Sequence, residues 1–555
     1  MLQLVGFTAI GFFISYYSTV SSSGWQGISY LNTDYILYAK ISKSLGVVGE
    51  ENGFFNLNLL DSFYNGPRPY HYFDLWGASL SSKLFCTNEF ISLKLVIYPI
   101  FYGLIMAICL SFFNRSITYY SLGIIVLLFL GGVYFPFESQ IDFFYKVNRL
   151  SFNLFDPFLN KLSYFYLFFF LSFIFYKNEK VELAVLSLLC LGVANIIIFP
   201  IVIVALLLSL SFMFYKKKLG RQKFYKNLRN IFLVAFLLLG FYTLNKSESP
   251  GLAGAEIGSP LKLIKDTLAL FDIRIQVNIL GLSLLSLFAL YLPLLVIIIA
   301  YWKKLNKNNN LQVPIVFTLS IVFTSLFAWM ALYTELNSSQ IFYNSSISLL
   351  NVFSIIAFIW WFKQLKADTH YLRKGIVSTL LIVAISTNVA QYFEKSILLK
   401  ENTHTNEYLT KLYKTIQEGE LVASLKAKED MMKMHSKYNA VYPLGNYLFL
   451  FDKDVNSINI GDLRTPIDSS SHINHKRSLK AISNGFFYKY AQENRTADQE
   501  IEEVEFNFLH DFEISHLILS KKADVPTYLE KHATMITKDS LSGERFYEID
   551  LSHVQ

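Results

Sequence analysis

The first 90 residues contain a loop, residues 21–90, in which ionisable side chains stand among aromatic ones. Asp34 lies early in this loop, and Arg68, His71 and Asp74 lie near its end. A carboxylate can accept a proton from a reacting group, a guanidinium binds phosphate through two hydrogen bonds, and a histidine can relay a proton or hold a metal ion. The loop therefore holds side chains that suit acid–base chemistry and phosphate binding.

Each of these residues also has a structural interpretation. Asp34 precedes a stretch with helical spacing, and an aspartate in that place can cap a helix by accepting backbone N–H groups. Arg68 can contact lipid headgroups, and a lone histidine such as His71 is often only part of a polar surface. The aromatic residues beside them, Tyr70, Tyr72 and Trp76, can rest at a membrane interface. Residue types and spacing leave both interpretations open.

Membrane helices are the elements that would position this loop. Of the 555 residues 53% are hydrophobic and only 16% charged, whereas soluble proteins average about 25% charged residues. Apolar segments of spanning length lie at residues 2–20, 91–113, 117–136, 161–176, 181–197, 198–215, 230–245, 277–301, 312–334, 341–362 and 375–394. We predict a polytopic α-helical membrane protein with about eleven transmembrane helices.

Two of these segments allow other interpretations. The first could be the core of a signal peptide, but no Lys or Arg precedes it, so we predict an uncleaved helix. The apolar run around Asn195 and Pro200 could form two short helices, one kinked helix or a re-entrant turn.

The distribution of charge orients the helices. The predicted inner loops carry basic runs, whereas the longer outer loops are sparse in Lys and Arg, as the positive-inside rule requires. The basic runs are 216–229, 302–307 and 363–374, and the outer loops are 21–90, 137–160 and 246–276. Residues 1–394 carry 29 basic and 18 acidic side chains and residues 395–555 carry 20 and 24, so the net charge of +7 does not indicate a nucleic-acid partner.

An odd number of crossings places residues 395–555 on the same outer side as loop 21–90. This tail combines a helix-like stretch, 406–435, with short apolar runs at 446–451 and 515–520 bounded by turn residues. We predict two domains: a transmembrane domain, 1–394, and a small extracytoplasmic α/β domain, 395–555. The three cysteines have no metal-ligand or redox spacing.

The motifs of the first loop resemble those of GT-C glycosyltransferases, a group that includes the protein O-mannosyltransferases and the lipid A aminoarabinose transferase. That family often has an acidic pair with Tyr, followed further along by Lys-Pro-Pro-Leu, Tyr and Trp. Here Asp34-Tyr35 is followed by Arg68-Pro69-Tyr70-His71-Tyr72 and then by Trp76. Thr33 replaces one acidic residue, and Arg68 with a single Pro replaces Lys-Pro-Pro, which leaves the metal requirement and the donor open.

The resemblance implies transfer of a sugar from a polyprenyl-phosphate carrier to a glycan, lipid or protein acceptor. Asp34 would be the general base, and Arg68 would stabilise the departing phosphate. Asp142, in the second outer loop, would be a second acidic residue that holds a metal ion or contacts the acceptor. The remaining candidates for substrate binding are Tyr70, His71, Tyr72, Asp74, Trp76, Arg149 and Arg274.

The resemblance therefore predicts a transferase in a bacterial inner membrane, embedded in lipid, with the C-terminal domain on the outer side. Three other functions stay open. A polysaccharide polymerase or ligase would be expected to have a large late outer loop, whereas residues 335–340 are a very short one. A flippase or transporter would need a polar pathway through the helices, and a membrane scaffold would differ only in lacking activity. The sugar, the acceptor, the carrier length, a divalent metal ion and the oligomeric state are left open.

Overall fold

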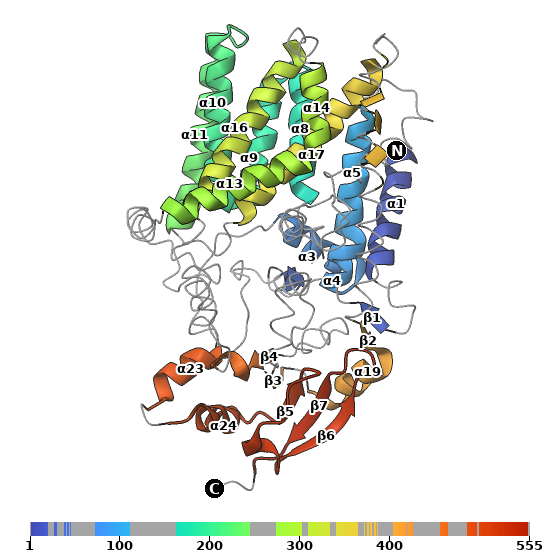
Figure 1. The fold of residues 1–555 in the computed structure, drawn as a ribbon, viewed down its shortest axis with the longest axis vertical. Helices are drawn as coiled ribbons and strands as arrows, with labels where there is room; N and C mark the ends of the chain where they lie inside the picture. Colours follow the sequence, from blue (N-terminus) through green and yellow to red (C-terminus); the bar gives the residue numbers. More distant parts are fainter. Residues whose placement is uncertain are drawn as a thin grey trace.

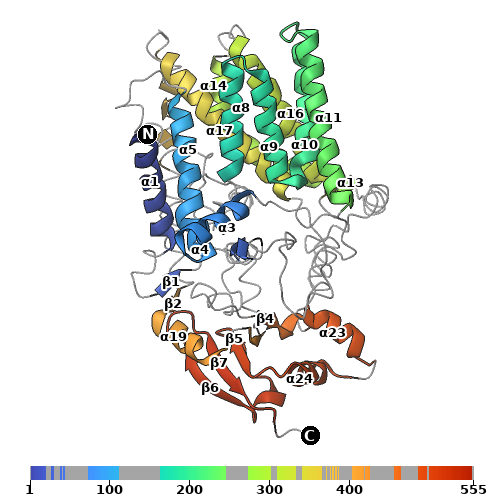
Figure 2. The ribbon, with the colours of Figure 1, turned by 180° about the vertical axis from the view of Figure 1, so that it is seen from behind.

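A computed structural model gives the structure of the protein. It describes residues 2–19, 27–29, 73–111, 163–244, 273–301, 309–332, 340–364, 403–417, 419–425, 456–463, 486–496 and 499–552, with a few further positions at 38–45 and 371–386. The described part contains a bundle of apolar helices and a C-terminal sheet with its own helices (Figures 1 and 2).

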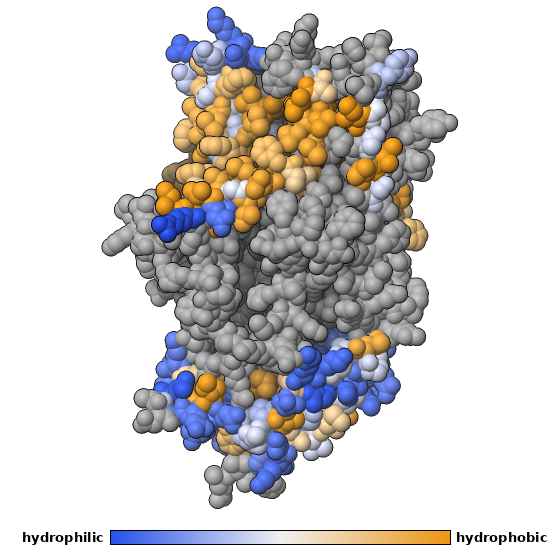
Figure 3. All heavy atoms as spheres, viewed as in Figure 1, coloured by the Kyte–Doolittle hydropathy of each residue, from blue (hydrophilic) through white to orange (hydrophobic). Residues whose placement is uncertain are grey.

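The helical bundle has the length and composition of a membrane domain. Four described segments are long and apolar enough to cross a membrane, and a pair of helices bent by 72° adds a fifth if it is one span. The four segments are Glu89–Ile108, Ile196–Tyr215, Arg221–Phe241 and Ile315–Leu332, and the bent pair is Gln276–Leu290 with Leu294–Ala300. The chain is therefore an integral membrane protein. Hydrophobic side chains cover the bundle in Figure 3, whereas hydrophilic ones gather over the C-terminal sheet and at the opposite end of the bundle.

The helices follow the predicted apolar segments closely. They are α1 (Leu2–Thr19), α5 (Tyr98–Ser111), α8 (Ser163–Lys177), α9 (Val181–Ala194), α10 (Phe199–Tyr215), α11 (Arg221–Leu244), α13 (Ile273–Leu290), α14 (Leu292–Ala300), α16 (Asn309–Leu332) and α17 (Gln340–Gln364). Two short helices, α3 (Phe73–Phe85) and α4 (Glu89–Ile91), and a π-helical segment, Ser92–Ile97, lead into α5. Of the predicted crossings, 117–136 lies outside the described residues, and only scattered helical positions between 375 and 386 are described in 375–394. The number eleven stays a prediction.

The region around Asn195 forms two helices joined by a tight turn. Helix α9 ends at Ala194, Asn195 is extended, and α10 begins at Phe199 with Pro200 in its first turn, where a proline needs no N–H partner. A Cβ at Gly192 would overlap the ring of Phe199. The turn therefore needs a glycine at position 192, because the chain comes back so close to itself.

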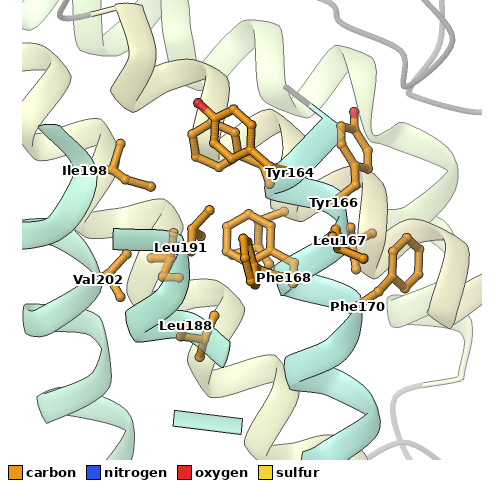
Figure 4. Packing of buried hydrophobic residues seen from close by; sticks show 14 of the residues in the cluster. Tyr164, Tyr166, Leu167, Phe168, Phe170, Leu188, Leu191, Ile198 and Val202 are labelled. Atoms are coloured by element: carbon orange, nitrogen blue, oxygen red, sulfur yellow. The ribbon is translucent and has the colours of Figure 1, made fainter. Parts of the chain in front are cut away.

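The core of the bundle is packed with aromatic and branched side chains. Figure 4 shows Phe168, Leu188 and Leu191 in one apolar layer, with the hydroxyl groups of Tyr164 and Tyr166 on one side of it. All of these side chains are less than a tenth exposed. Because lipid contributes no hydrophobic driving force between helices, such interfaces depend on close packing and on hydrogen bonds between the few polar groups.

Small residues bring α1 and α5 into close contact. A Cβ built at Gly11 would lie 3.0 Å from the Cβ of Tyr102 and 3.1 Å from the carbonyl oxygen of Pro99, whereas one at Gly6 meets nothing within 4 Å. Glycines let helix backbones approach in membranes, so Gly11 is the position in α1 where a side chain is excluded.

We therefore expect Gly11→Val to destabilise the bundle by about 1–3 kcal/mol, which is typical of overpacking. Thermal unfolding of the protein in detergent measures the effect, and Gly6→Val in the same helix is the matched control. Equal midpoints for the two variants would show that the contact between α1 and α5 is looser than the structure has it.

The C-terminal part contains a five-stranded mixed sheet with the order β4-β3-β5-β7-β6. The strands are β3 (Leu421–Leu425), β4 (Asn456–Asn459), β5 (His516–Leu519), β6 (Ala533–Lys538) and β7 (Arg545–Ile549), and the helices are α19 (Asn406–Thr415), α23 (Phe486–Asn494) and α24 (Ile501–Asp511). Strand β3 is parallel to β4 and β5, and β7 is antiparallel to β5 and β6.

Each face of this sheet is covered by helices. Val422, Ile518 and Phe546 pack with α19 on one face. Leu421, Ala423, Leu517 and Leu519 pack with α23 and α24 on the other. This division follows from the alternation of side chains along a strand.

The predicted helical stretch 406–435 is wrong between Ile416 and Leu425, and its last ten positions, 426–435, lie outside the described residues. Helix α19 ends at Thr415, Gly419 has a φ of 79°, and residues 421–425 form the central strand β3. Amphipathic spacing identified the first part of the stretch, but the turn depends on a left-handed backbone conformation that favours glycine. The predicted run 515–520 contains β5, and the run 446–451 lies outside the described residues.

A second, small sheet joins the start of the first loop to the start of the C-terminal part. Strand β1 (Gly27–Ser29) pairs antiparallel with β2 (Thr403–Thr405), with Ile28 opposite His404. Both strands lie at the end of the bundle that faces the C-terminal sheet (Figure 1). The start of the first loop and the C-terminal part therefore lie on the same side of the bundle. The turn between α10 and α11, which carries exposed Lys216, Lys217 and Lys218, lies at the other end (Figures 1 and 2).

Candidate functional site

The structure describes three of the predicted site residues. Asp74 and Trp76 lie in α3, and Arg274 lies in the first turn of α13. The others lie outside the described residues: Asp34, Arg68, Tyr70, His71, Tyr72, Asp142 and Arg149. Their proposed roles stay predictions.

Asp74 is a fully buried carboxylate at the start of α3, with no exposed surface. It accepts a hydrogen bond of 3.2 Å from the hydroxyl of Tyr98, which is the first residue of α5 and is also fully buried. Asp74 suits the first turn of a helix, because a negative charge there interacts favourably with the helix dipole. Burying a charged carboxylate is costly unless it is paired and hydrogen-bonded, so a membrane protein seldom keeps one without a function.

Two further polar side chains lie at the same site. Tyr164, at the start of α8, is fully buried and lies within electrostatic range of Asp74. The amide nitrogen of Asn195, in the turn after α9, donates a hydrogen bond of 2.9 Å to the hydroxyl of Tyr164. We name Asp74, Tyr98, Tyr164 and Asn195 the Asp74 cluster. It joins α3, α5, α8 and the turn after α9, which are distant in the sequence.

Two polar atoms at the cluster have no hydrogen-bond partner within the described residues. They are Oδ1 of Asn195 and Oγ of the neighbouring Ser163, and both side chains are 1% exposed. An unsatisfied buried acceptor costs about 1–3 kcal/mol. The cluster therefore has spare capacity to bind the hydroxyl groups of a polar ligand.

Sequence reasoning missed Tyr98, Tyr164 and Asn195. Asn195 did stand out as a polar residue within an apolar run, but only its effect on helix boundaries was considered. A tyrosine at the start of a membrane helix is usually assigned to the interfacial belt. Only the fold shows that these side chains meet Asp74.

Lys94 is a second ionisable residue that the sequence did not bring out. It lies in the π-helical segment Ser92–Ile97, within the span Glu89–Ile108, and is fully buried. Lys94 is therefore an ionisable side chain buried within a membrane-spanning segment. Single π-helical turns are frequent at functional sites, and Lys94 lies four residues before Tyr98 of the Asp74 cluster.

Trp76 and Arg274 do not join the cluster. Trp76, Leu80 and Leu84 are 46%, 62% and 68% exposed and follow one another at intervals of four residues, so they form an apolar stripe on the outer face of α3. This placement fits an interfacial aromatic residue. Arg274 is exposed, and α13 begins at the edge of the bundle away from α3 (Figure 1).

A second buried network lies deeper in the bundle. Tyr291 donates hydrogen bonds to Oδ1 of Asn351 (2.6 Å) and to the carbonyl of Ile347 (3.0 Å), and Nδ2 of Asn351 donates to the hydroxyl of Tyr166 (2.7 Å). Tyr291 lies at the bend between α13 and α14. Because each of these bonds joins separate helices, the network fixes the bend against α8 and α17.

The described residues contain no group of three or more His, Cys, Asp or Glu side chains that could hold a metal ion. Asp34, His71 and Asp142, the residues that would be considered as ligands, lie outside those residues. The metal requirement stays open.

The C-terminal part contains two buried pairs of histidine and carboxylate. Nδ1 of His404 lies 2.8 Å from Oδ2 of Asp539, and His516 contacts Glu420 through its own Nδ1. Burial alone would raise the pKa of Asp539, but hydrogen bonds from His404 and Ser542 and the attraction of the His404 ring hold the pKa well below its usual value. The pKa of Glu420 is also lowered, because bonds from His516, from the Gln417 N–H and from Ser515 outweigh its burial.

These pKa shifts predict loss of the C-terminal sheet in acid. A carboxylate with a lowered folded-state pKa stabilises the fold above its unfolded pKa of about 4, and the stabilisation disappears as the pH falls toward the folded value. Hydrogen-exchange protection factors of β5 and β7, corrected for intrinsic exchange, should therefore fall steadily from about pH 5 to pH 3. Glu420→Gln, which removes the carboxylate that contacts His516 of β5, should lower protection at pH 7 and flatten this dependence. An unchanged slope in that variant would assign the acid sensitivity to other groups.

Comparison with known proteins gives matches among solved structures alone, since no protein-family model and no curated protein matches the chain. ArnT from Cupriavidus metallidurans in the apo state has 10% identity and a TM-score of 0.48, with 99% of this chain and 98% of that chain covered. ArnT bound to undecaprenyl phosphate has 8% identity and a TM-score of 0.47 over the same shares. The archaeal oligosaccharyltransferase AglB from Archaeoglobus fulgidus, in complex with an inhibitory peptide and a dolichol-phosphate, has 10% identity and a TM-score of 0.36, covering 100% and 75%.

The resemblance of the first loop to GT-C glycosyltransferases therefore stays a prediction. Identities of 8–10% and TM-scores below 0.5 do not transfer an activity. The function is therefore proposed from the residues of this chain.

Proposed function

We propose that the protein is a membrane glycosyltransferase, which moves a sugar from a polyprenyl-phosphate carrier to a glycan, lipid or protein acceptor. The observation that carries the proposal is the Asp74 cluster, a fully buried carboxylate that accepts a hydrogen bond from Tyr98 and lies within electrostatic range of Tyr164, to which Asn195 donates. It lies at the end of the bundle that faces the C-terminal sheet (Figure 2). In the sequence Asp74 follows the motif Arg68–Tyr72, with only Phe73 between them.

The proposed reaction assigns one task to each charged group. The acceptor hydroxyl or amine attacks the anomeric carbon and loses its proton to Asp34. The bond between that carbon and the phosphate oxygen breaks, and the bonding electrons leave with the phosphate, which Arg68 stabilises. Asp74 stabilises the positive charge that develops on the sugar ring, as carboxylates do in other reactions at an anomeric carbon.

The other predicted residues complete the proposed site. Tyr70, His71 and Tyr72 would bind the sugar or the phosphate, and Asp142 would hold a metal ion or contact the acceptor. Arg149 and Arg274 belong to the second and third outer loops, which would cover the carrier. Trp76 would rest in the membrane interface beside the site, as its exposure on α3 supports.

The proposed topology has eleven crossings, an inner N-terminus and an outer C-terminal domain, 395–555, in a bacterial inner membrane. Two observations support it. The β1–β2 pairing joins the first loop to the C-terminal part, and the exposed lysines of the α10–α11 turn lie at the opposite end, as the positive-inside rule requires of the inner face.

A flippase for lipid-linked glycans is the second candidate. The first half of α17 favours it, because several uncharged polar side chains there are buried inside the bundle: Asn344, Ser345, Ser346, Ser348 and Asn351. Ser345 and Ser346 donate hydrogen bonds to a carbonyl of their own helix, at Phe342, which reduces their value as a polar pathway. A transferase therefore accounts for more of the buried polar residues of the bundle than a flippase does.

The decisive experiment uses purified protein in vesicles with labelled polyprenyl-phosphate sugars and a mixture of lipid, glycan and peptide acceptors. The expected result is label in an acceptor together with an equal amount of free polyprenyl phosphate. Parallel reactions with EDTA show whether a divalent ion is required. Movement of intact labelled carrier across the vesicle membrane without transfer would replace the proposed transferase by the flippase. If no donor gives transfer or movement, a membrane scaffold is the function that is left.

A further inference from the structure

Asp539 is the centre of a hydrogen-bonded contact between β2 and the turn that joins β6 to β7. Its carboxylate has no exposed surface. Oδ1 accepts hydrogen bonds from the N–H (3.1 Å) and hydroxyl (2.9 Å) of Thr405, and Oδ2 bonds to Nδ1 of His404 (2.8 Å). Ser542 donates to Oδ2 from its N–H (3.1 Å) and its hydroxyl (2.5 Å). A single side chain therefore fixes two successive residues of β2.

The surroundings of His404 strengthen this contact. Nε2 of His404 lies 3.5 Å from a carboxylate oxygen of Glu544, in the same turn as Asp539. The ring also stacks on Tyr408 of α19, with the centroids 5.8 Å apart. The opposing strand β1 brings no charged side chain, since it consists of Gly27, Ile28 and Ser29. Both carboxylates that face the histidine thus come from the β6–β7 turn.

Through β2 the contact reaches the first loop. His404 pairs with Ile28 of β1, so Asp539 holds β2 and β2 holds β1. A second anchor lies at Ala39, which is fully buried and packs in the same apolar cluster as Tyr408 and Leu409 of α19. Its neighbour Tyr38 belongs to the core of the bundle. Asp34 lies between these two anchors in the sequence.

We infer that Asp539 is a positioning residue for the reaction: through His404 and β2 it holds β1 at the start of the first outer loop, the loop that carries Asp34 in the sequence. The inference rests on the proposed function, because it concerns the placement of the proposed base. A misplacement of about 1 Å can lower a rate by about 10²-fold, so the rate of the chemical step reports the placement. Because Asp539 lies in the β6–β7 turn of the C-terminal part, we expect its loss to alter the alignment of the base more than the binding of the sugar and the carrier.

Hydrogen exchange of the full-length protein in lipid nanodiscs tests the structural half of the inference without any substrate. In Asp539→Asn the amides of 27–29 and 403–405 are expected to exchange at least about tenfold faster, because the pairing opens locally. The amides of β5 should change much less. Asp511→Asn is the matched control, since Asp511 accepts a hydrogen bond from Tyr490 on α23, on the opposite face of the sheet.

Kinetics test the other half. Asp539→Asn should lower kcat by about tenfold or more while KM for donor and acceptor changes less than about twofold, because binding is kept and alignment is lost. Ile28→Pro should produce the same loss, since proline removes an N–H from β1 and leaves the C-terminal sheet intact. The double variant should be no slower than either single one, because both act through the same strand pair.

The outcomes separate this inference from the proposed function. Transfer by the wild type with unchanged kcat and exchange in both variants would overturn the inference and leave the function standing. A fall in kcat for Asp539→Asn with faster exchange throughout the sheet, but no fall for Ile28→Pro, would also overturn it, because the residue would then serve stability alone. If the wild type transfers no sugar, the proposed function fails, and unchanged exchange at 27–29 would still refute the positioning contact itself.

Discussion

Asp34→Asn is expected to lower the rate of sugar transfer by about 10²- to 10⁴-fold, the range that a positioned general base contributes. Asparagine has the shape of aspartate and caps helices about as well, so a capping role would survive this substitution. The described positions 38, 39, 42 and 43 are helical, and Ser42 donates a hydrogen bond to the carbonyl of Tyr38 one turn earlier, whereas Asp34 itself lies outside the described residues. The substitution thus separates the two roles that the sequence left open.

The measurement compares membranes with matched amounts of wild type, Asp34→Asn and Asp61→Asn, supplied with labelled donor. Asp61 is in the same loop and serves as the control for a lost negative charge. Activity kept in Asp34→Asn would remove the base from this position and leave the cap. Equal loss in both Asp variants would point to the overall charge of the loop instead.

Asp74→Asn and Asp74→Leu are expected to lower transfer by similar factors, about 10²- to 10³-fold, because both remove the charge that would stabilise the transition state. Asparagine can still accept the hydrogen bond from Tyr98, whereas leucine cannot. Tyr98→Phe removes the bond and keeps the charge, and should cost about tenfold, since a hydrogen bond to a charged group contributes about 1.5–3 kcal/mol. Initial rates at saturating donor, with thermal midpoints measured beside them, give the comparison.

A structural role for Asp74 makes the opposite prediction. If the carboxylate only joins α3 to α5, Asp74→Asn should be nearly as active as the wild type, and the losses in Asp74→Leu and Tyr98→Phe should follow their thermal midpoints. That pattern would remove the Asp74 cluster from the proposed chemistry.

The sequence was informative about the membrane helices because their cause is local. A spanning helix needs an uninterrupted run of apolar residues, and hydropathy located α8, α10 and α16 within a few residues. It was less informative near Asn195, where three interpretations remained, because the turn depends on the close approach of Phe199 to Gly192. Such an approach involves tertiary packing and leaves no periodic signal.

The candidate site was predictable in part. The first loop and Asp74 were recognised from residue types and motif order, but their partners were not. Asn195 meets Tyr164 across 31 residues, and His404 meets Asp539 across 135. Contacts of this range depend on how the elements pack, and a single sequence does not contain them. Trp76 is two positions from Asp74 in the sequence, yet it lies on the exposed face of α3 while Asp74 is buried, and its role in substrate binding stays a prediction.

The pairing of β1 with β2 also has a consequence for biosynthesis. Ile28 and His404 are 376 positions apart, so β1 leaves the ribosome long before its partner strand exists. At about 5–20 residues per second, the wait is about 20–75 s, during which the intervening helices must be inserted. The β6–β7 turn that secures β2 is made later still, near residue 539. The pairing that secures the start of the first loop is therefore completed last. A chain that ends before the β6–β7 turn has inserted helices, but its β1 is not yet secured and the proposed base is not yet fixed in place.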